Sequence, residues 1–131
     1  MSLSLFAGPC SPASPTRSFE TIFDKRRLLD TLGGDESTMH EVLKMFLDDM
    51  PTQINRLEEA VNSGDARRAT RQAHTVEGAA ASVGAVLLRE CSASLEELGR
   101  TSQLDEIGVR LNDLRAEFAE VRKVVEKELR I

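Results

Sequence analysis

The chain has 131 residues, of which 40% are hydrophobic and 30% charged, and its formal net charge is −5. This length suits one domain with a single core. Acidic and basic residues are interleaved without a basic stripe, so nucleic acid is not an expected partner. No apolar run approaches the ~20 residues that span a bilayer, and the N-terminus lacks the basic segment of a secretory signal. With only two cysteines, Cys10 and Cys91, we expect a protein of the reducing cytoplasm, without membrane insertion.

The first part of the chain differs in composition from the rest. Residues 1–18 are rich in Ser, Pro and Gly, which predicts a disordered tail or linker. Residues 19–131 are expected to form one helical domain. It opens with a short helix for which Asp24 is the N-cap and Phe23 packs behind it. This helix is expected to stop at Gly33-Gly34.

The second predicted helix begins near Asp35 and extends to about Asn62. Its apolar residues recur at helical spacing, and Pro51 within this pattern predicts a kink or a short break. The segment Ser63-Gly64-Asp65 ends this helix and provides the N-cap of the next one. The positions expected to be buried are Met39, Val42, Leu43, Phe46, Leu47, Met50, Ile54, Leu57 and Val61.

Three further helices follow, and no strand pattern appears. The third is expected to reach about Ser82 and to end at Gly84, the fourth to end near Gly99, and the fifth to carry nearly strict heptads from Leu104 to Leu129. Short loops between long amphipathic helices favour antiparallel neighbours. The expected fold is all-α: an antiparallel up-down four-helix bundle, with a short additional N-terminal helix covering one end.

His74 lies on the third predicted helix, away from its apolar stripe. At about 100° per residue, the stripe is centred roughly 130° from His74, so the imidazole should face solvent. The residues that share its side of the helix are Arg67, Arg71, Gly78 and Ala81. An exposed histidine is most often an ordinary surface residue. Gly78 costs about 1 kcal/mol relative to Ala, which favours open space for an approaching protein, although a packing contact between helices is the alternative.

The residues around His74 resemble the histidine-containing phosphotransfer (HPt) domain. That family's motif is His-x-x-Lys-Gly with a second Gly six residues after the first, and His74, Gly78 and Gly84 match it. The resemblance covers roughly residues 20–129. Further matching segments are Phe23-Asp24, Leu32-Gly33-Gly34-Asp35, Phe46-Leu47, Pro51, Leu57, Gly64-Asp65, Ala73-His74-Thr75 and Leu95-Glu96-Glu97-Leu98.

The resemblance implies a four-helix bundle with a phosphorylatable histidine exposed midway along one helix. It implies that His74 exchanges a phosphoryl group with an aspartate of receiver domains, and that the domain has no kinase activity of its own. The expected partners are receiver domains and a hybrid histidine kinase, and the chain is expected to be a monomer.

One residue departs from the family motif. Glu77 stands where the family carries lysine, and a carboxylate there is expected to repel a phosphohistidine, by an unscreened amount on the order of a few kcal/mol. Arg67 or Arg71 is expected to offset this repulsion, and Arg100 at the end of the neighbouring helix to reach the site. The predicted phosphoryl and receiver-docking surface comprises Arg67, Arg71, Glu77, Gly78, Ala81 and Arg100.

A histidine suits a phosphocarrier because much of the imidazole is neutral at pH 7. The chain has no P-loop and no Gly-rich nucleotide loop, so ATP binding is not expected. No cofactor or metal site is predicted, because His40 has no ligand-like companions. Two alternatives remain: a docking module that Glu77 has disabled for phosphorylation, and a purely structural bundle. That His74 and Gly78 are both present favours the carrier.

Overall fold

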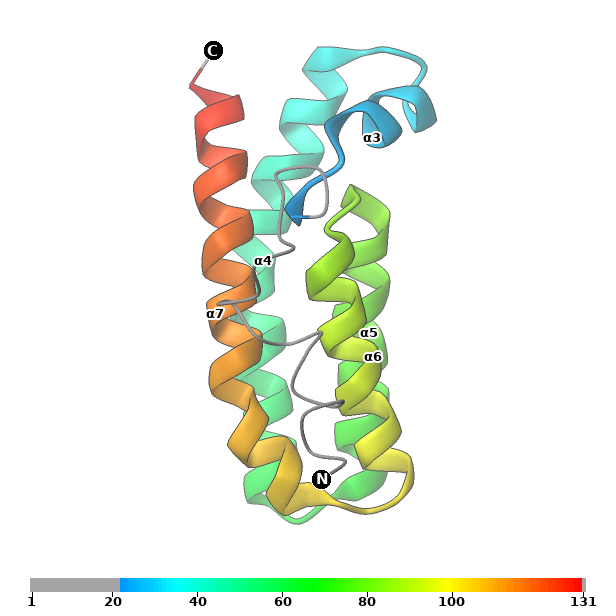
Figure 1. The fold of residues 1–131 in the computed structure, drawn as a ribbon, viewed down its shortest axis with the longest axis vertical. Helices are drawn as coiled ribbons and strands as arrows, with labels where there is room; N and C mark the ends of the chain where they lie inside the picture. The colour runs from blue at the N-terminus through cyan, green and yellow to red at the C-terminus, as the bar shows by residue number, and fades with distance from the viewer. Residues whose placement is uncertain (1–21, 131) are drawn as a thin grey trace, which may run out of the picture.

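The computed structural model describes residues 22–130. The expected tail, residues 1–18, lies outside this part of the chain. The four long helices run alternately up and down, and the short helix lies across one end of the bundle (Figure 1). The predicted all-α bundle with its short N-terminal helix is therefore confirmed. In chain order the helices are α3 (Lys25–Thr31), α4 (Glu36–Asn62), α5 (Ala66–Val83), α6 (Val86–Arg100) and α7 (Leu104–Leu129).

Three aspartates begin helices, as their positions before the apolar stripes predicted. The carboxylates of Asp24, Asp35 and Asp65 each accept a hydrogen bond from the backbone N–H three residues later, at 3.1, 3.1 and 3.0 Å. Each bond satisfies one of the free N–H groups of a first helical turn. Helix α5 ends at Gly84, whose φ of 78° is left-handed and therefore suits glycine.

Helix α4 continues through Pro51 without interruption, so of the kink or short break expected there, the break was wrong. A proline inside a helix removes one backbone hydrogen bond. The buried side chains on both sides of it hold the two halves of α4 to the same core: Met50 before the proline, and Ile54 and Leu57 after it, are at most 1% exposed. Packing therefore outweighs the local preference for a break.

The core is built from the apolar faces of the four long helices. On α5 this face consists mainly of small residues, and Ala69, Ala73, Val76 and Ala80 are fully buried. Small side chains bring the helix axes closer together than a leucine-rich face would. The end of the bundle is covered by α3, whose preceding residue Asp24 donates its N–H to the Gly84 carbonyl at 2.9 Å.

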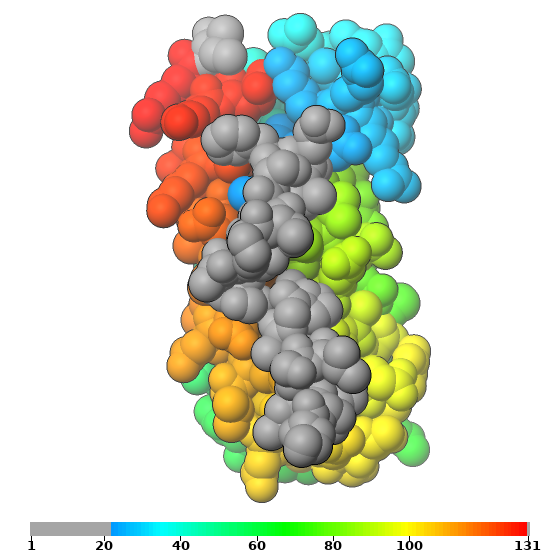
Figure 2. All heavy atoms as spheres, viewed as in Figure 1, coloured from blue at the N-terminus to red at the C-terminus, as the bar shows by residue number. Residues whose placement is uncertain are grey.

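Helix α3 also contacts the C-terminal end of α7. Lys25 Nζ lies 2.8 Å from Glu128 Oε2. In Figure 2 the last turns of α7 and the residues of α3 share one end of the molecule. Within residues 22–130, no helix combines the length and apolar character needed to cross a membrane.

The contact between α5 and α6 depends on a glycine. A Cβ atom added at Gly99 would collide with Thr70 Oγ1 and would lie only 3.1 Å from the Thr70 Cα. A rotation of the threonine side chain cannot relieve the contact with its Cα. Any larger residue at Gly99 therefore pushes the two helices apart.

We expect Gly99→Ala to lower the free energy of unfolding by ~1–3 kcal/mol, because overpacking a tight contact outweighs the helix propensity gained. Gly108→Ala is the matched control, since its Cβ would meet only Val61 Cγ1 at an ordinary 3.8 Å. The control should be neutral or slightly stabilising. Urea titrations of both variants measure this, and equal midpoints would contradict the packing role of Gly99.

Candidate functional site

The connection between α5 and α6 sets the register that builds the site. Gly84 and Ala85 are the only residues between the two helices, so residues equally far from this turn face each other across the pair. His74 and Glu96 are each eleven positions from Ala85 and meet side by side. About one turn further from the loop Thr70 meets Gly99, which are fifteen and fourteen positions from Ala85.

The His74 imidazole is exposed, and one of its two ring nitrogens is held. Its side chain is 70% exposed, as its position opposite the apolar stripe predicted, and Nδ1 lies 3.1 Å from Glu96 Oε2. An ionised carboxylate only accepts hydrogen bonds. Nδ1 therefore carries the proton of the neutral ring, and the lone pair is on Nε2.

Arg100 contacts the same oxygen of Glu96 as His74 does. Its guanidinium donates to Glu96 Oε2 at 2.7 Å and to Glu97 Oε1 at 3.2 Å. Arg100 thus reaches the site, as expected, but it contacts the carboxylate that supports His74. Only 9% of the Glu96 side chain is exposed, and the contact with Arg100 fixes its carboxylate beside the imidazole.

Glu77 lies beside this pair and is more enclosed than a surface carboxylate. Its side chain is 23% exposed, and Oε1 lies 3.5 Å from His74 Nδ1. That same oxygen is buried and accepts no hydrogen bond within the described part of the chain, residues 22–130. The carboxylate that replaces the motif lysine is therefore next to the nitrogen that carries the proton.

The two carboxyl groups influence each other's ionisation. The pKa of Glu77 is raised, because a hydrogen bond to Glu96 favours its protonated form and burial adds to this effect. For Glu96, burial opposes ionisation, but the hydrogen bonds from Glu77 and His74 and the charge of Arg100 outweigh it and lower the pKa. The lowered pKa of Glu96 favours its ionised form, which supports the assignment of the proton to Nδ1.

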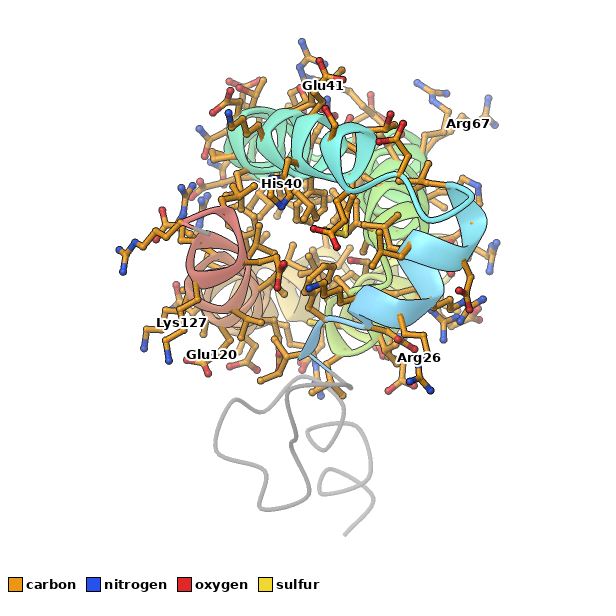
Figure 3. All side chains as sticks on the ribbon, turned by 90° about the horizontal axis from the view of Figure 1, so that it is seen from above. Arg26, His40, Glu41, Arg67, Glu120 and Lys127 are labelled. Carbon is orange, nitrogen blue, oxygen red and sulfur yellow. The ribbon has the colours of Figure 1, made fainter. Side chains whose placement is uncertain are left out.

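The remaining predicted site residues lie on the exposed side of α5. Arg67, Arg71, Gly78 and Ala81 are all exposed, and Figure 3 shows Arg67 pointing away from the bundle. Among residues 22–130, no direct hydrogen bond or ion pair joins Arg67 or Arg71 to His74. The two arginines are available to a partner.

Gly78 faces open space. A Cβ atom there would have no neighbour within 4 Å, so the alternative that this glycine permits close packing between helices is excluded. Because glycine has no side chain, the surface of α5 one helical turn beyond His74 is accessible to a partner.

An apolar groove lies between α4 and α5 and includes Ala79, the residue that follows Gly78. It was not anticipated from the sequence, because Met45 lies outside the predicted core stripe of α4 and was not singled out. The Met45 side chain is 70% exposed. The groove is lined by Val42, Met45, Phe46, Asp48, Asp49, Met50, Ala79, Ser82 and Val83.

The other histidine is separate from this site. Figure 3 shows His40 directed toward the interior of the bundle, and its Nε2 is buried without a hydrogen-bond partner in the part of the chain that the structure describes. We assign it no chemical role.

A protein-family comparison matches residues 41–124 to the Hpt domain. The chain therefore belongs to the Hpt family, which confirms the resemblance noted in the sequence. A comparison with curated protein sequences found no match.

Solved structures agree. The fold is similar to the crystal structure of histidine-containing phosphotransfer protein B from Pseudomonas aeruginosa PAO1, with a TM-score of 0.77 and 28% identity over 83% of this chain and 95% of that one. It also matches the fold of the HPT domain of an Hpt sensor hybrid histidine kinase from Shewanella, with a TM-score of 0.68 and 19% identity over 86% of this chain and 96% of that one.

Proposed function

We propose that this protein is a phosphorelay carrier in which His74 accepts a phosphoryl group from a receiver-domain aspartate and returns it to another. The observation that carries the proposal is the 3.1 Å contact between His74 Nδ1 and the buried Glu96, which leaves the Nε2 lone pair free on a 70% exposed ring. The chain itself is a carrier and not a kinase.

The transfer step uses that lone pair. Nε2 attacks the phosphorus of the partner's aspartyl phosphate, the P–O bond to the aspartate breaks, and the aspartate leaves as a carboxylate. The new N–P bond makes the ring a phosphoimidazolium that still holds its proton on Nδ1. This positive charge develops 3.1 Å from Glu96, so Glu96 stabilises the transition state more than the ground state. The Mg²⁺ ion that neutralises the phosphoryl oxygens comes with the receiver.

The receiver is proposed to dock over α5 and the groove beside it. Gly78 leaves room next to His74, and the exposed Met45 and the partly buried Ala79 offer an apolar contact. Arg67 and Arg71 are cations on the same side of the helix and would face the acidic phosphorylation site of a receiver. A hybrid histidine kinase would present its receiver domain to the same face.

A panel of phosphorylated receiver domains tests the proposal. We expect at least one to transfer phosphate to the full chain, with acid-labile and base-stable label. If receivers bind without any transfer, the chain is instead a docking module that does not carry phosphate.

Glu96 is a positioning residue, and its replacement should show this in two measurements. A hydrogen bond to a charged group contributes ~1.5–3 kcal/mol, so Glu96→Ala should slow transfer on the order of tenfold or more. Glu96→Gln keeps an acceptor oxygen and should restore part of the rate. Nitrogen-15 NMR of the His74 ring should show the proton on Nδ1 in the wild type and a mixture of tautomers in Glu96→Ala. If the His74 ring in Glu96→Ala keeps its proton on Nδ1 as in the wild type, Glu96 does not position the ring.

Glu77 is expected to reduce the stability of the phosphorylated state. Glu77→Lys replaces repulsion by attraction and should shift the phosphoryl equilibrium from the receiver toward His74. The shift should be less than about tenfold, that is below about 1.4 kcal/mol, because the phosphoryl group would lie on the exposed His74 ring, where solvent screens its charge. The ratio of phosphohistidine to phosphoaspartate at fixed ionic strength measures it.

The matched variant is Arg71→Ala, which should shift the same ratio toward the receiver. Identical ratios in Glu77→Lys and the wild type would show that Glu77 has no electrostatic part in the reaction.

A further inference from the structure

His74, Glu77 and Glu96 bring three metal-ligand atoms together. The atoms are His74 Nδ1, Glu77 Oε1 and Glu96 Oε2, and all lie within 4.8 Å of one another. Two of the separations are 3.1 and 3.5 Å. Ligand atoms of a tetrahedral zinc site with bonds of about 2.1 Å lie about 3.4 Å apart. The described part of the chain, residues 22–130, holds no second group of this kind.

The state of Glu77 is a second, independent observation. Its Oε1 is buried and accepts no hydrogen bond from any residue between 22 and 130, although it is directed at His74. A buried carboxylate oxygen without a partner is unfavourable. A cation between Oε1 and Nδ1 would provide that partner and would also separate the charges of the two carboxylates.

We propose that His74, Glu77 and Glu96 form a binding site for a divalent transition-metal ion with one imidazole and two carboxylate ligands. Such a donor set suits Zn²⁺, whereas Mg²⁺ prefers oxygen ligands alone. Water completes the coordination on the exposed side. With both glutamates ionised, the charges of the ligands and the ion cancel.

Arg100 competes with the metal. Its guanidinium lies 2.7 Å from the proposed ligand atom Glu96 Oε2 and must move when an ion binds. The side chain is 58% exposed and has room to rotate into solvent. The affinity of the site is therefore expected to rise when Arg100 is removed.

Metal binding would block phosphate uptake; this consequence rests on the proposed function. A neutral imidazole has one N–H and one lone pair. If Nδ1 donates its lone pair to the ion, the proton must lie on Nε2, and Nε2 then has no lone pair to attack phosphorus. The ion would hold the carrier in an inactive tautomer.

Isothermal titration of the full chain with ZnCl2 at neutral pH tests the site without any receiver. We expect one ion per chain, with binding weakened at least tenfold in His74→Gln, Glu77→Gln and Glu96→Gln. Glu90→Gln is the matched control, because it removes an exposed carboxylate from the same helix, and it should bind as the wild type does. Arg100→Ala should bind more tightly. Circular dichroism checks that each variant is folded.

Equal affinity in the wild type and His74→Gln would overturn the site, and so would weaker binding by Arg100→Ala. Nitrogen-15 NMR gives a second readout: added Zn²⁺ should move the His74 proton from Nδ1 to Nε2. A ring that keeps its proton on Nδ1 at saturating zinc would contradict coordination through that atom. Neither result depends on phosphotransfer, so a failure here leaves the carrier function untouched, and a failed receiver panel leaves the metal site untouched.

Discussion

His74→Gln should accept no phosphate from any receiver that phosphorylates the wild type. Glutamine has a side-chain amide of similar reach, but its nitrogen lone pair is delocalised and does not attack phosphorus. His74 is exposed and lies off the apolar stripe of α5, so its replacement removes the nucleophile without opening a cavity. Phosphate on the chain, measured after incubation with a phosphorylated cognate receiver, should fall to background.

The control for this variant is its fold. Its helical circular dichroism and unfolding midpoint should stay close to those of the wild type, since surface substitutions usually change stability by no more than ~0.5 kcal/mol. His40→Gln should still accept phosphate, because that histidine is directed into the bundle. Label that persists in His74→Gln would show that another residue accepts the phosphate.

Gly78→Leu should slow phosphoryl transfer by on the order of 100-fold or more. A Cβ atom at Gly78 has no neighbour within 4 Å, so a leucine there, one turn beyond His74, would project into open space. It would hold a receiver away from the imidazole, and a displacement of about 1 Å from the reactive geometry can cost a factor of about 100. Single-turnover transfer from a phosphorylated receiver measures the loss.

Two further glycine variants separate the effect of steric access for the receiver from the effect on helix stability. Gly78→Ala should retain transfer and raise the unfolding free energy by up to about 1 kcal/mol, because alanine is the better helix former. Gly108→Leu places the same bulk on α7 and should transfer normally. If Gly78→Leu transfers at the wild-type rate, the glycine is not needed for a receiver to reach His74.

The helices and their ends could be predicted from local patterns. Asp35 and Asp65 precede apolar stripes, and each accepts the capping hydrogen bond that such a position allows. Pro51 shows the limit of this reasoning: the local rule favours a break, and the core contacts on either side of the proline keep the helix continuous.

The exposed half of the site was predictable for the same reason, because the azimuth of His74 on α5 follows from the positions of the buried residues. Glu96 was not identified as a site residue, since a carboxylate 22 positions away gives no local signal. Its partner could have been found from the short α5–α6 turn, which pairs residues equally distant from Ala85. The orientation of Glu77 needed the packed structure, because a residue at this azimuth can point either to solvent or along α6.

The Glu77 position also changes the meaning of the departure from the family motif. The sequence alone suggested repulsion between this carboxylate and a phosphoryl group. In the fold, Glu77 Oε1 lies 3.5 Å from Nδ1 and shares its surroundings with Glu96. The protonated nitrogen therefore has two carboxylates beside it. The attraction between Glu77 and the charged ring partly offsets the repulsion between Glu77 and the phosphoryl oxygens on Nε2, which is why we expect only a small shift in Glu77→Lys.

Nε2 of His74 is the atom that we propose carries the phosphoryl group. Phosphorus-31 and nitrogen-15 NMR of the ring-labelled chain, after transfer from a receiver, locates the N–P bond directly. We expect coupling of phosphorus to Nε2 of His74 and a proton on Nδ1. Phosphate bonded to Nδ1, or found on any residue other than His74, would contradict it.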